Sequence, residues 1–133
     1  MENAVFLNAT KLNFDNKIDF TSIAKLTTLT KYEESTDQEI LDRVKDQTII
    51  FTKELALGRN LISQFPASVK LICEAGTGYN NIDIVSAREK NITVCNVPSY
   101  STEAVAHLVI TYILNFSSSL IQRQIMIKQK NFD

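Results

Sequence analysis

Residues 71–116 read LICEAGTGYNNIDIVSAREKNITVCNVPSYSTEAVAHLVITYILNF, and the interpretation of the whole chain starts from this stretch. Its first residues, Leu71-Ile72-Cys73, are typical of a buried strand, and a second strand is expected over residues 92–97. Between them the chain turns at Gly76-Thr77-Gly78, which contains two of the three glycines in the sequence. Glycine permits positive φ and close approach to the backbone, so this turn is the candidate binding site for a small molecule.

Short apolar segments alternate with helical segments in the rest of the chain. Further strands are predicted over residues 4–9, 26–32 and 48–52, and the strand that contains Leu71-Ile72-Cys73 is expected to begin at Val69. Thr36-Asp37-Gln38-Glu39 is a capping box that predicts the start of a helix, and another helix is expected over residues 55–65. This alternation favours the α/β class: a flavodoxin-like, doubly wound parallel sheet of about five strands, followed by a long apolar C-terminal helix.

The composition is that of an ordinary globular domain, with 44% hydrophobic and 22% charged residues and a net charge of -1. A nearly neutral chain offers no electrostatic footprint for nucleic acid. The first apolar run, residues 4–7, is too short for a secretory signal. Cys73 and Cys95 both lie in apolar, strand-like segments, so we expect buried free thiols and a cytoplasmic location.

Ligands of parallel α/β sheets bind beyond the carboxyl ends of the strands. Four segments are expected at that edge, and they are residues 8–11, 52–54, 75–81 and 98–102. The helix after the glycine turn is predicted to begin near Asn81, and its free N–H groups suit a carboxylate or phosphate. The alternative is a turn that serves only strand-to-helix geometry. Lys53 either points into the cleft or is a solvated loop lysine.

The last helix is apolar on nearly every side. Ten of the thirteen residues from Ala104 to Phe116 are apolar, and the exceptions, His107, Thr111 and Asn115, form one polar stripe. One sheet covers only one side of a helix, so this helix is expected to pack against another domain or chain. The polar stripe argues against a membrane span. We therefore predict a homodimer through residues 102–121.

The sequence does not assemble an active site. His107 is the only histidine, and Glu103 lies one helical turn before it, which is the spacing of any surface pair on a helix. No Ser–His–acid set, metal-ligand cluster or phosphate-binding loop can be formed from these residues. No catalytic residue and no metal site are therefore predicted in this chain.

At AGTGYNNID and AREKNITVCNVPSYSTEAVAHLVITYIL, with VKDQTIIFTKELAL upstream, the sequence resembles the D-isomer-specific 2-hydroxyacid dehydrogenases, in particular the glycerate dehydrogenase or hydroxypyruvate reductase branch. The resemblance implies an NAD-dependent enzyme that reduces a 2-keto acid to a D-2-hydroxy acid, with a flavodoxin-like substrate domain facing a Rossmann domain. It also implies that the backbone of Gly76, Thr77 and Gly78 receives the substrate carboxylate and that Thr77 contacts NAD. Lys53 matches a position near the substrate pocket, although Thr52 stands where this branch often has asparagine.

The sequence also departs from the family pattern. The family's G-x-G-x-x-G motif, its acidic ribose-binding residue and its catalytic arginine, glutamate and histidine do not occur in this chain, and His107 does not match the catalytic histidine. The expected organisation is a substrate domain over residues 1–100 and a hinge helix over residues 101–133 that leads to an absent NAD-binding domain. Such a fragment is expected to be inactive by itself.

Two other interpretations are considered. The first is a non-enzymatic module that self-associates or binds a partner through the apolar helix over residues 102–121, and it stays open. The second is a receiver or flavodoxin domain, which agrees with the topology. The residues that such domains require are missing, because the first strand ends in Asn8-Ala9-Thr10, without the paired aspartates of a receiver domain or the glycine-rich phosphate loop of a flavodoxin.

Overall fold

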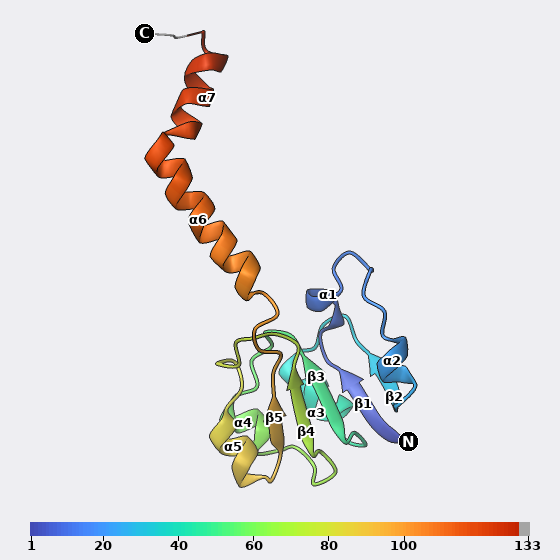
Figure 1. The fold of residues 1–133 in the computed structure, drawn as a ribbon. Helices are drawn as coiled ribbons and strands as arrows, with labels where there is room; N and C mark the ends of the chain where they lie inside the picture. The colour runs from blue at the N-terminus through green and yellow to red at the C-terminus, as the bar shows by residue number, and fades with distance from the viewer. Residues whose placement is uncertain (131–133) are drawn as a thin grey trace. The chain divides into compact units, whose positions relative to one another are not determined.

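The computed structural model of the protein describes residues 1–130 and contains two compact units (Figure 1). The first unit is Met1–Pro98, and the second begins at Ser99. Ser99 has a φ of 65°, in the left-handed region that few non-glycine residues adopt. Residues 131–133, the end of the segment predicted as a hinge helix, lie outside the described residues.

The first unit is built on a five-stranded sheet in the order β2-β1-β3-β4-β5. The strands are β1 (Glu2–Phe6), β2 (Thr27–Lys31), β3 (Ile49–Thr52), β4 (Leu71–Glu74) and β5 (Thr93–Cys95). Every neighbouring pair is parallel. This is the flavodoxin-like strand order, so the predicted α/β fold class is confirmed. Each strand overlaps the segment predicted for it.

Short helices connect the strands of this unit, and they are α1 (Ala9–Leu12), α2 (Thr21–Ala24), α3 (Asp37–Arg43), α4 (Arg59–Ile62) and α5 (Ile84–Glu89). The predicted capping box is present at α3, where the hydroxyl of Thr36 accepts a hydrogen bond from the Glu39 N–H and the Glu39 side chain accepts one from the Thr36 N–H. The helix expected over residues 55–65 is shorter than predicted. It begins only after Gly58, because Leu57 pairs in an extended conformation with Ile82.

The core lies on one face of the sheet. Val5, Ile50 and Ile72 are fully buried and lie side by side because β1, β3 and β4 pair in register at these positions. Helices α3, α4 and α5 cover this face with buried side chains of their own, which are Ile40, Leu61, Ile62 and Ala87. The alternation of strand residues therefore places one continuous apolar row beneath three helices.

The opposite face is covered unevenly. Phe6 is buried there against Phe20, with their ring centroids 6.0 Å apart in an edge-on arrangement. In register with Phe6 across the sheet lie Phe51 and Cys73, both partly exposed, and then Cys95, which is exposed. Both cysteines are free thiols, but the prediction that both are buried is wrong, because Cys73 is only partly buried and Cys95, on the edge strand β5, is exposed.

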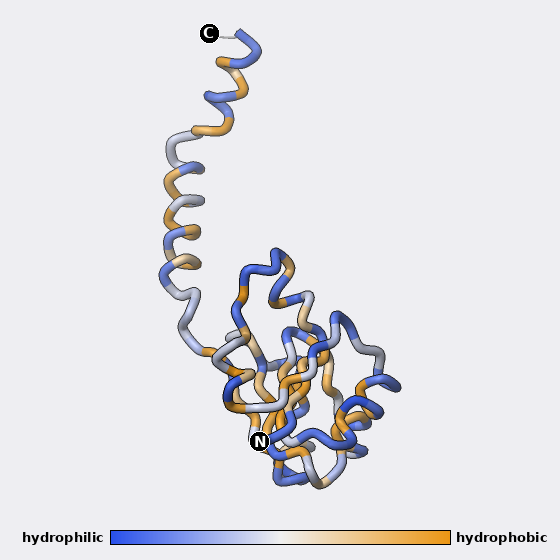
Figure 2. Tube along the Cα trace, turned by 90° about the vertical axis from the view of Figure 1, so that its right-hand side faces the viewer, coloured by the Kyte–Doolittle hydropathy of each residue, from blue (hydrophilic) through white to orange (hydrophobic). Residues whose placement is uncertain are grey.

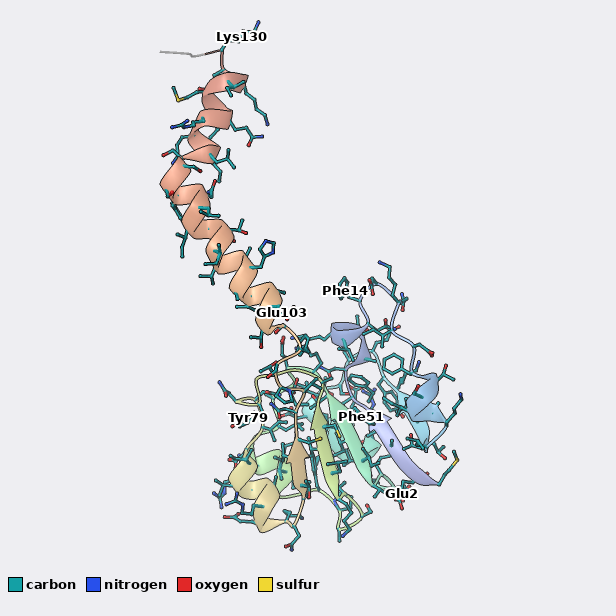
Figure 3. The ribbon with its side chains drawn as sticks, viewed as in Figure 1. Glu2, Phe14, Phe51, Tyr79, Glu103 and Lys130 are labelled. Carbon is teal, nitrogen blue, oxygen red and sulfur yellow. The ribbon has the colours of Figure 1, made fainter. Side chains whose placement is uncertain are left out.

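The second unit consists of α6 (Thr102–Ser118) and α7 (Leu120–Lys128), neither of which contains a buried residue. The prediction of one long apolar helix over residues 102–121 is not confirmed. Ser119 adopts a left-handed conformation, with φ 51° and ψ 37°, and the two helix axes differ by 58°. Apolar positions recur along both helices in Figure 2, and side chains stand out around them in Figure 3.

Within residues 1–130, no single helix is both long and apolar enough to cross a membrane. The bent pair α6 and α7 reaches the required length and composition only when its two members are taken together.

The buried row predicts how the sheet responds to truncation. Ile50→Ala, at the centre of the sheet, is expected to lower the free energy of unfolding by about 2–5 kcal/mol, because it leaves a cavity beneath three helices. Thr28→Ala, on an exposed position of β2, should cost less than about 1 kcal/mol. Urea unfolding followed by circular dichroism measures both, and equal losses would contradict the packing described above.

Candidate functional site

The loops after β1 and β3 are joined by one buried amide at the carboxyl edge of the sheet. Asn8 is 3% exposed, and its side chain makes two hydrogen bonds to the backbone of Lys53. The Asn8 Nδ2 donates to the Lys53 carbonyl at 2.5 Å, and the Asn8 Oδ1 accepts from the Lys53 N–H at 2.9 Å. This pairing fixes the position from which the Lys53 side chain extends.

A buried carboxylate joins the loops after β3 and β4. Glu74, the last residue of β4, is 1% exposed. Its carboxylate accepts a hydrogen bond from the Glu54 N–H at 3.0 Å and another from the Asn81 Nδ2 at 2.9 Å. Glu54 has a φ of 54°, and the hydrogen bond from its N–H to Glu74 holds it in this strained conformation.

Lys53 packs its ammonium group against the glycine turn. A Cβ added to Gly76 would lie 2.7 Å from the Lys53 Nζ and 3.2 Å from the Glu74 Oε1. The Lys53 Nζ also forms an ion pair with the Glu54 Oε1 at 2.7 Å. The hydrogen bond from Lys53, and then its charge, lower the pKa of the Glu54 carboxyl.

The reason for glycine at position 76 is therefore close packing. Neither Gly76 nor Gly78 has a positive φ, so of the two properties that suggested a site, positive φ is absent and close approach to the backbone is present at Gly76. At Gly78 an added Cβ would meet nothing within 4 Å. The two glycines thus differ: the first leaves space for a lysine and a buried carboxylate, and the second faces open space.

The turn itself is held by the residues that follow β5. The Val97 N–H donates to the Gly76 carbonyl at 2.9 Å, and the Asn96 Nδ2 donates to the Thr77 carbonyl at 2.7 Å. The Thr77 hydroxyl donates to the Val97 carbonyl at 3.1 Å. Thr77 and Gly78 are exposed, and their N–H groups donate no hydrogen bond within residues 1–130. The turn therefore presents two available donors on a fixed backbone.

The helix after the turn begins later than the start predicted near Asn81. Helix α5 begins at Ile84, and the Asp83 carboxylate caps it by accepting from the Ser86 N–H at 2.8 Å. This hydrogen bond lowers the pKa of Asp83. Asn81 instead donates to the Leu55 carbonyl at 2.8 Å and to Glu74.

The structure thus brings together Lys53, Gly76, Thr77 and Gly78, all of which the sequence predicts as site residues. One residue of this edge was not predicted from the sequence. Glu74 was overlooked, although an acidic residue that ends the apolar run Leu71-Ile72-Cys73 is a recognisable signal. His107 and Glu103 lie on α6 in the second unit, and no hydrogen bond or ion pair joins them within the described chain. The described residues contain no group of three metal-ligating side chains.

The fold and the edge geometry define an α/β domain of the flavodoxin-like class, with backbone donors and one ammonium group beside a glycine turn. The catalytic-domain model of the D-isomer specific 2-hydroxyacid dehydrogenases matches residues 9–129. The chain therefore belongs to the D-isomer specific 2-hydroxyacid dehydrogenase family.

Similar proteins are consistent with this assignment. A protein of Haemophilus influenzae that is named as a 2-hydroxyacid dehydrogenase is 39% identical to this chain over 93 residues. These residues are 70% of this chain and 29% of that protein. A hydroxypyruvate reductase of Blautia hydrogenotrophica is 31% identical over 77 residues, or 58% of this chain and 24% of that protein. The D-lactate dehydrogenase of Aquifex aeolicus, solved with NAD and lactic acid, has the same fold, with a TM-score of 0.81 at 24% identity over 98% of this chain and 38% of its own. The chain thus spans well under half the length of these proteins.

The two glycines allow a matched test of the turn. Gly76→Ala is expected to lower the free energy of unfolding by about 1–3 kcal/mol, because the new methyl group displaces Lys53 and presses on the Glu74 carboxylate. Gly78→Ala should leave stability unchanged or raise it by about 0.4–1 kcal/mol, since its backbone suits alanine. Thermal and urea unfolding compare the two, and a greater loss at Gly78 would refute the packing argument.

Proposed function

We propose that this chain is the substrate-binding part of an NAD-dependent D-2-hydroxyacid dehydrogenase and that it binds a small 2-keto or 2-hydroxy acid at the glycine turn. The observation that carries this proposal is the pair of available N–H groups at Thr77 and Gly78, beside the ammonium of Lys53. The family membership and the hydroxypyruvate reductase among the relatives support the class of substrate. We propose a cytoplasmic location, because both cysteines are free thiols, as is usual in a reducing compartment.

The turn suits a carboxylate for physical reasons. Two neighbouring N–H groups donate to the two oxygens of one carboxylate, and each hydrogen bond to a charged group contributes about 1.5–3 kcal/mol. Lys53 adds a positive charge at the Gly76 end of the turn. The Thr77 hydroxyl and carbonyl are already bonded to residues 96 and 97, so the donors are fixed in place before the ligand arrives. Little ordering is then needed on binding.

The described residues do not form a dinucleotide site by themselves. The three glycines stand at positions 58, 76 and 78, so no G-x-G-x-x-G motif exists in the sequence. The role proposed for this chain toward NAD is limited to an edge contact through Thr77, which is exposed at the end of the turn. We assign no catalytic step to residues of this chain, and we propose that residues 1–100 are the substrate domain.

The second unit is proposed to be a hinge and assembly element over residues 101–133. Twelve of its large apolar side chains are each at least 48% exposed, and they are Val105, Leu108, Val109, Ile110, Tyr112, Ile113, Leu114, Phe116, Leu120, Ile121, Ile125 and Ile127. Full burial of one such side chain is worth about 1.5–3 kcal/mol. About half of this burial is unrealised across the twelve, which is comparable to the roughly 5–15 kcal/mol that stabilises a whole domain. We therefore propose that a second copy of the chain covers α6 and α7.

The same exposed surface favours the second candidate function, a non-enzymatic module that only self-associates. The two candidates differ at the glycine turn, because only a substrate domain requires the turn to bind an acid. A ligand titration therefore separates them.

The substrate-domain proposal predicts which amides respond to a 2-keto acid. Titration of the labelled chain with hydroxypyruvate or glyoxylate should shift the NMR signals of the Thr77 and Gly78 amides in a saturable way. Lys53→Gln should weaken this binding about tenfold, which corresponds to about 1.4 kcal/mol. No NADH should be consumed with either acid.

The control is Lys70→Gln, which removes an exposed lysine at the amino end of β4 and should leave the affinity unchanged. If the Thr77 and Gly78 signals do not change at a saturating concentration of the acid, the substrate-domain proposal is contradicted and the self-associating module is the favoured function.

Self-association predicts a doubled mass. Sedimentation velocity should show a dimer at micromolar concentration, and Ile113→Glu should weaken it at least tenfold, because a charge replaces an apolar contact. Thr111→Glu lies on the polar stripe of the same helix and should have the smaller effect. A clean monomer at the highest attainable concentration contradicts the proposed dimer.

A further inference from the structure

The two cysteines of the chain lie directly opposite each other on adjacent strands. Cys73 of β4 pairs with Cys95 of β5 in the parallel register, and the two Sγ atoms are 3.3 Å apart. Both are free thiols in the structure, and the chain contains no other cysteine. Side chains at paired positions of a sheet project from the same face, so the sulfurs face each other without any rearrangement of the fold.

The two thiols differ in access to solvent. Cys95 is exposed on the edge strand, whereas Cys73 is partly buried between β3 and β5. Burial, together with the hydrogen bond and the charge of Cys95, raises the pKa of Cys73 to about 12. Thiolates are the reactive form of cysteine, so an oxidant in solution meets Cys95 first. Cys73 lies beside Cys95, so it is placed to react second, with the oxidised sulfur of Cys95.

We propose that Cys73 and Cys95 form a redox modification site, in which a hydroperoxide oxidises the pair to a disulfide between β4 and β5. In the first step the Cys95 thiolate attacks the hydroperoxide, takes one oxygen to become a sulfenic acid and releases an alcohol or water. In the second step the Cys73 sulfur attacks the Cys95 sulfur, and the hydroxyl leaves as water with the proton of Cys73. The two thiols are oxidised by two electrons, and the hydroperoxide is reduced by two.

The structure favours closure of the bond within one chain. The sulfurs need to approach from 3.3 Å to the roughly 2 Å of a disulfide. Strand β5 has a strand on one side only, so it can make this small movement without separating two neighbours. An exposed disulfide of this kind is accessible to small thiols, which reverse the reaction by exchange. The proposal does not depend on the ligand assigned to the glycine turn.

The test uses the whole 133-residue chain and hydrogen peroxide. Mild oxidation should give a chain that is not cross-linked to another chain, has lost two hydrogens and no longer reacts with an alkylating reagent. Trypsin should then release a cross-linked pair of peptides, residues 71–88 and 91–123, which dithiothreitol separates. A product that retains alkylatable Cys73, or one linked only between chains, would overturn the proposal.

Single substitutions test the order of the steps. In Cys73→Ser the sulfenic acid on Cys95 has no neighbouring thiol, so trapping by dimedone should rise several-fold over the wild-type chain. In Cys95→Ser the remaining Cys73 should react with peroxide at least tenfold more slowly. Circular dichroism checks that both variants are folded, and equal peroxide reactivity of the two single variants counts against the proposed order.

Discussion

The carboxylate of Glu74 is the constraint on which the carboxyl edge of the sheet depends. An unpaired buried carboxylate costs several kcal/mol, so this side chain remains buried only because neighbouring groups donate to it. The donors are the N–H of Glu54 and the side-chain amide of Asn81, which belong to two different loops. Satisfying one buried charge therefore fixes both loops, and Lys53, whose backbone is held by Asn8, lies over Gly76 at the same edge. The local order of the edge follows from the last residue of one strand.

Much of the fold and part of the candidate site could be predicted from the sequence. Strands such as Leu71–Glu74 were recognisable because short apolar runs suit a buried parallel sheet, and Thr36 and Glu39 marked the start of α3 through local chemistry. Lys53 and the glycine turn could be placed at one edge because the carboxyl ends of parallel strands meet there. These predictions used only neighbours in the sequence or the general geometry of a sheet.

The features that were not predicted depend on partners far apart in the chain. Asn8 bonds to Lys53, 45 residues away, and Glu74 bonds to Glu54, 20 residues away, so no local pattern announces either contact. The start of α5 was misplaced because Asn81 donates its side-chain amide to Leu55 and Glu74, and Asp83 caps the helix instead. The interruption at Ser119 was missed for a different reason. The Ser118 hydroxyl donates to the Leu114 carbonyl at 2.8 Å, which is a hydrogen bond typical of helix bends. A count of the apolar residues in the helix does not reveal this bond.

Charge alone does not account for the selectivity proposed for the glycine turn. Lys53 is paired with Glu54, the charge of Lys11 also acts on Glu54, and Glu74 lies within reach of the same groups, so positive and negative charges balance at this edge. A bound anion is then favoured mainly by hydrogen bonds from the two N–H groups. Such bonds weaken steeply when the donor angle or distance departs from its optimum. The three hydrogen bonds with residues 96 and 97 hold the turn in one geometry, and the proposed selectivity for a carboxylate therefore rests on the position of the backbone.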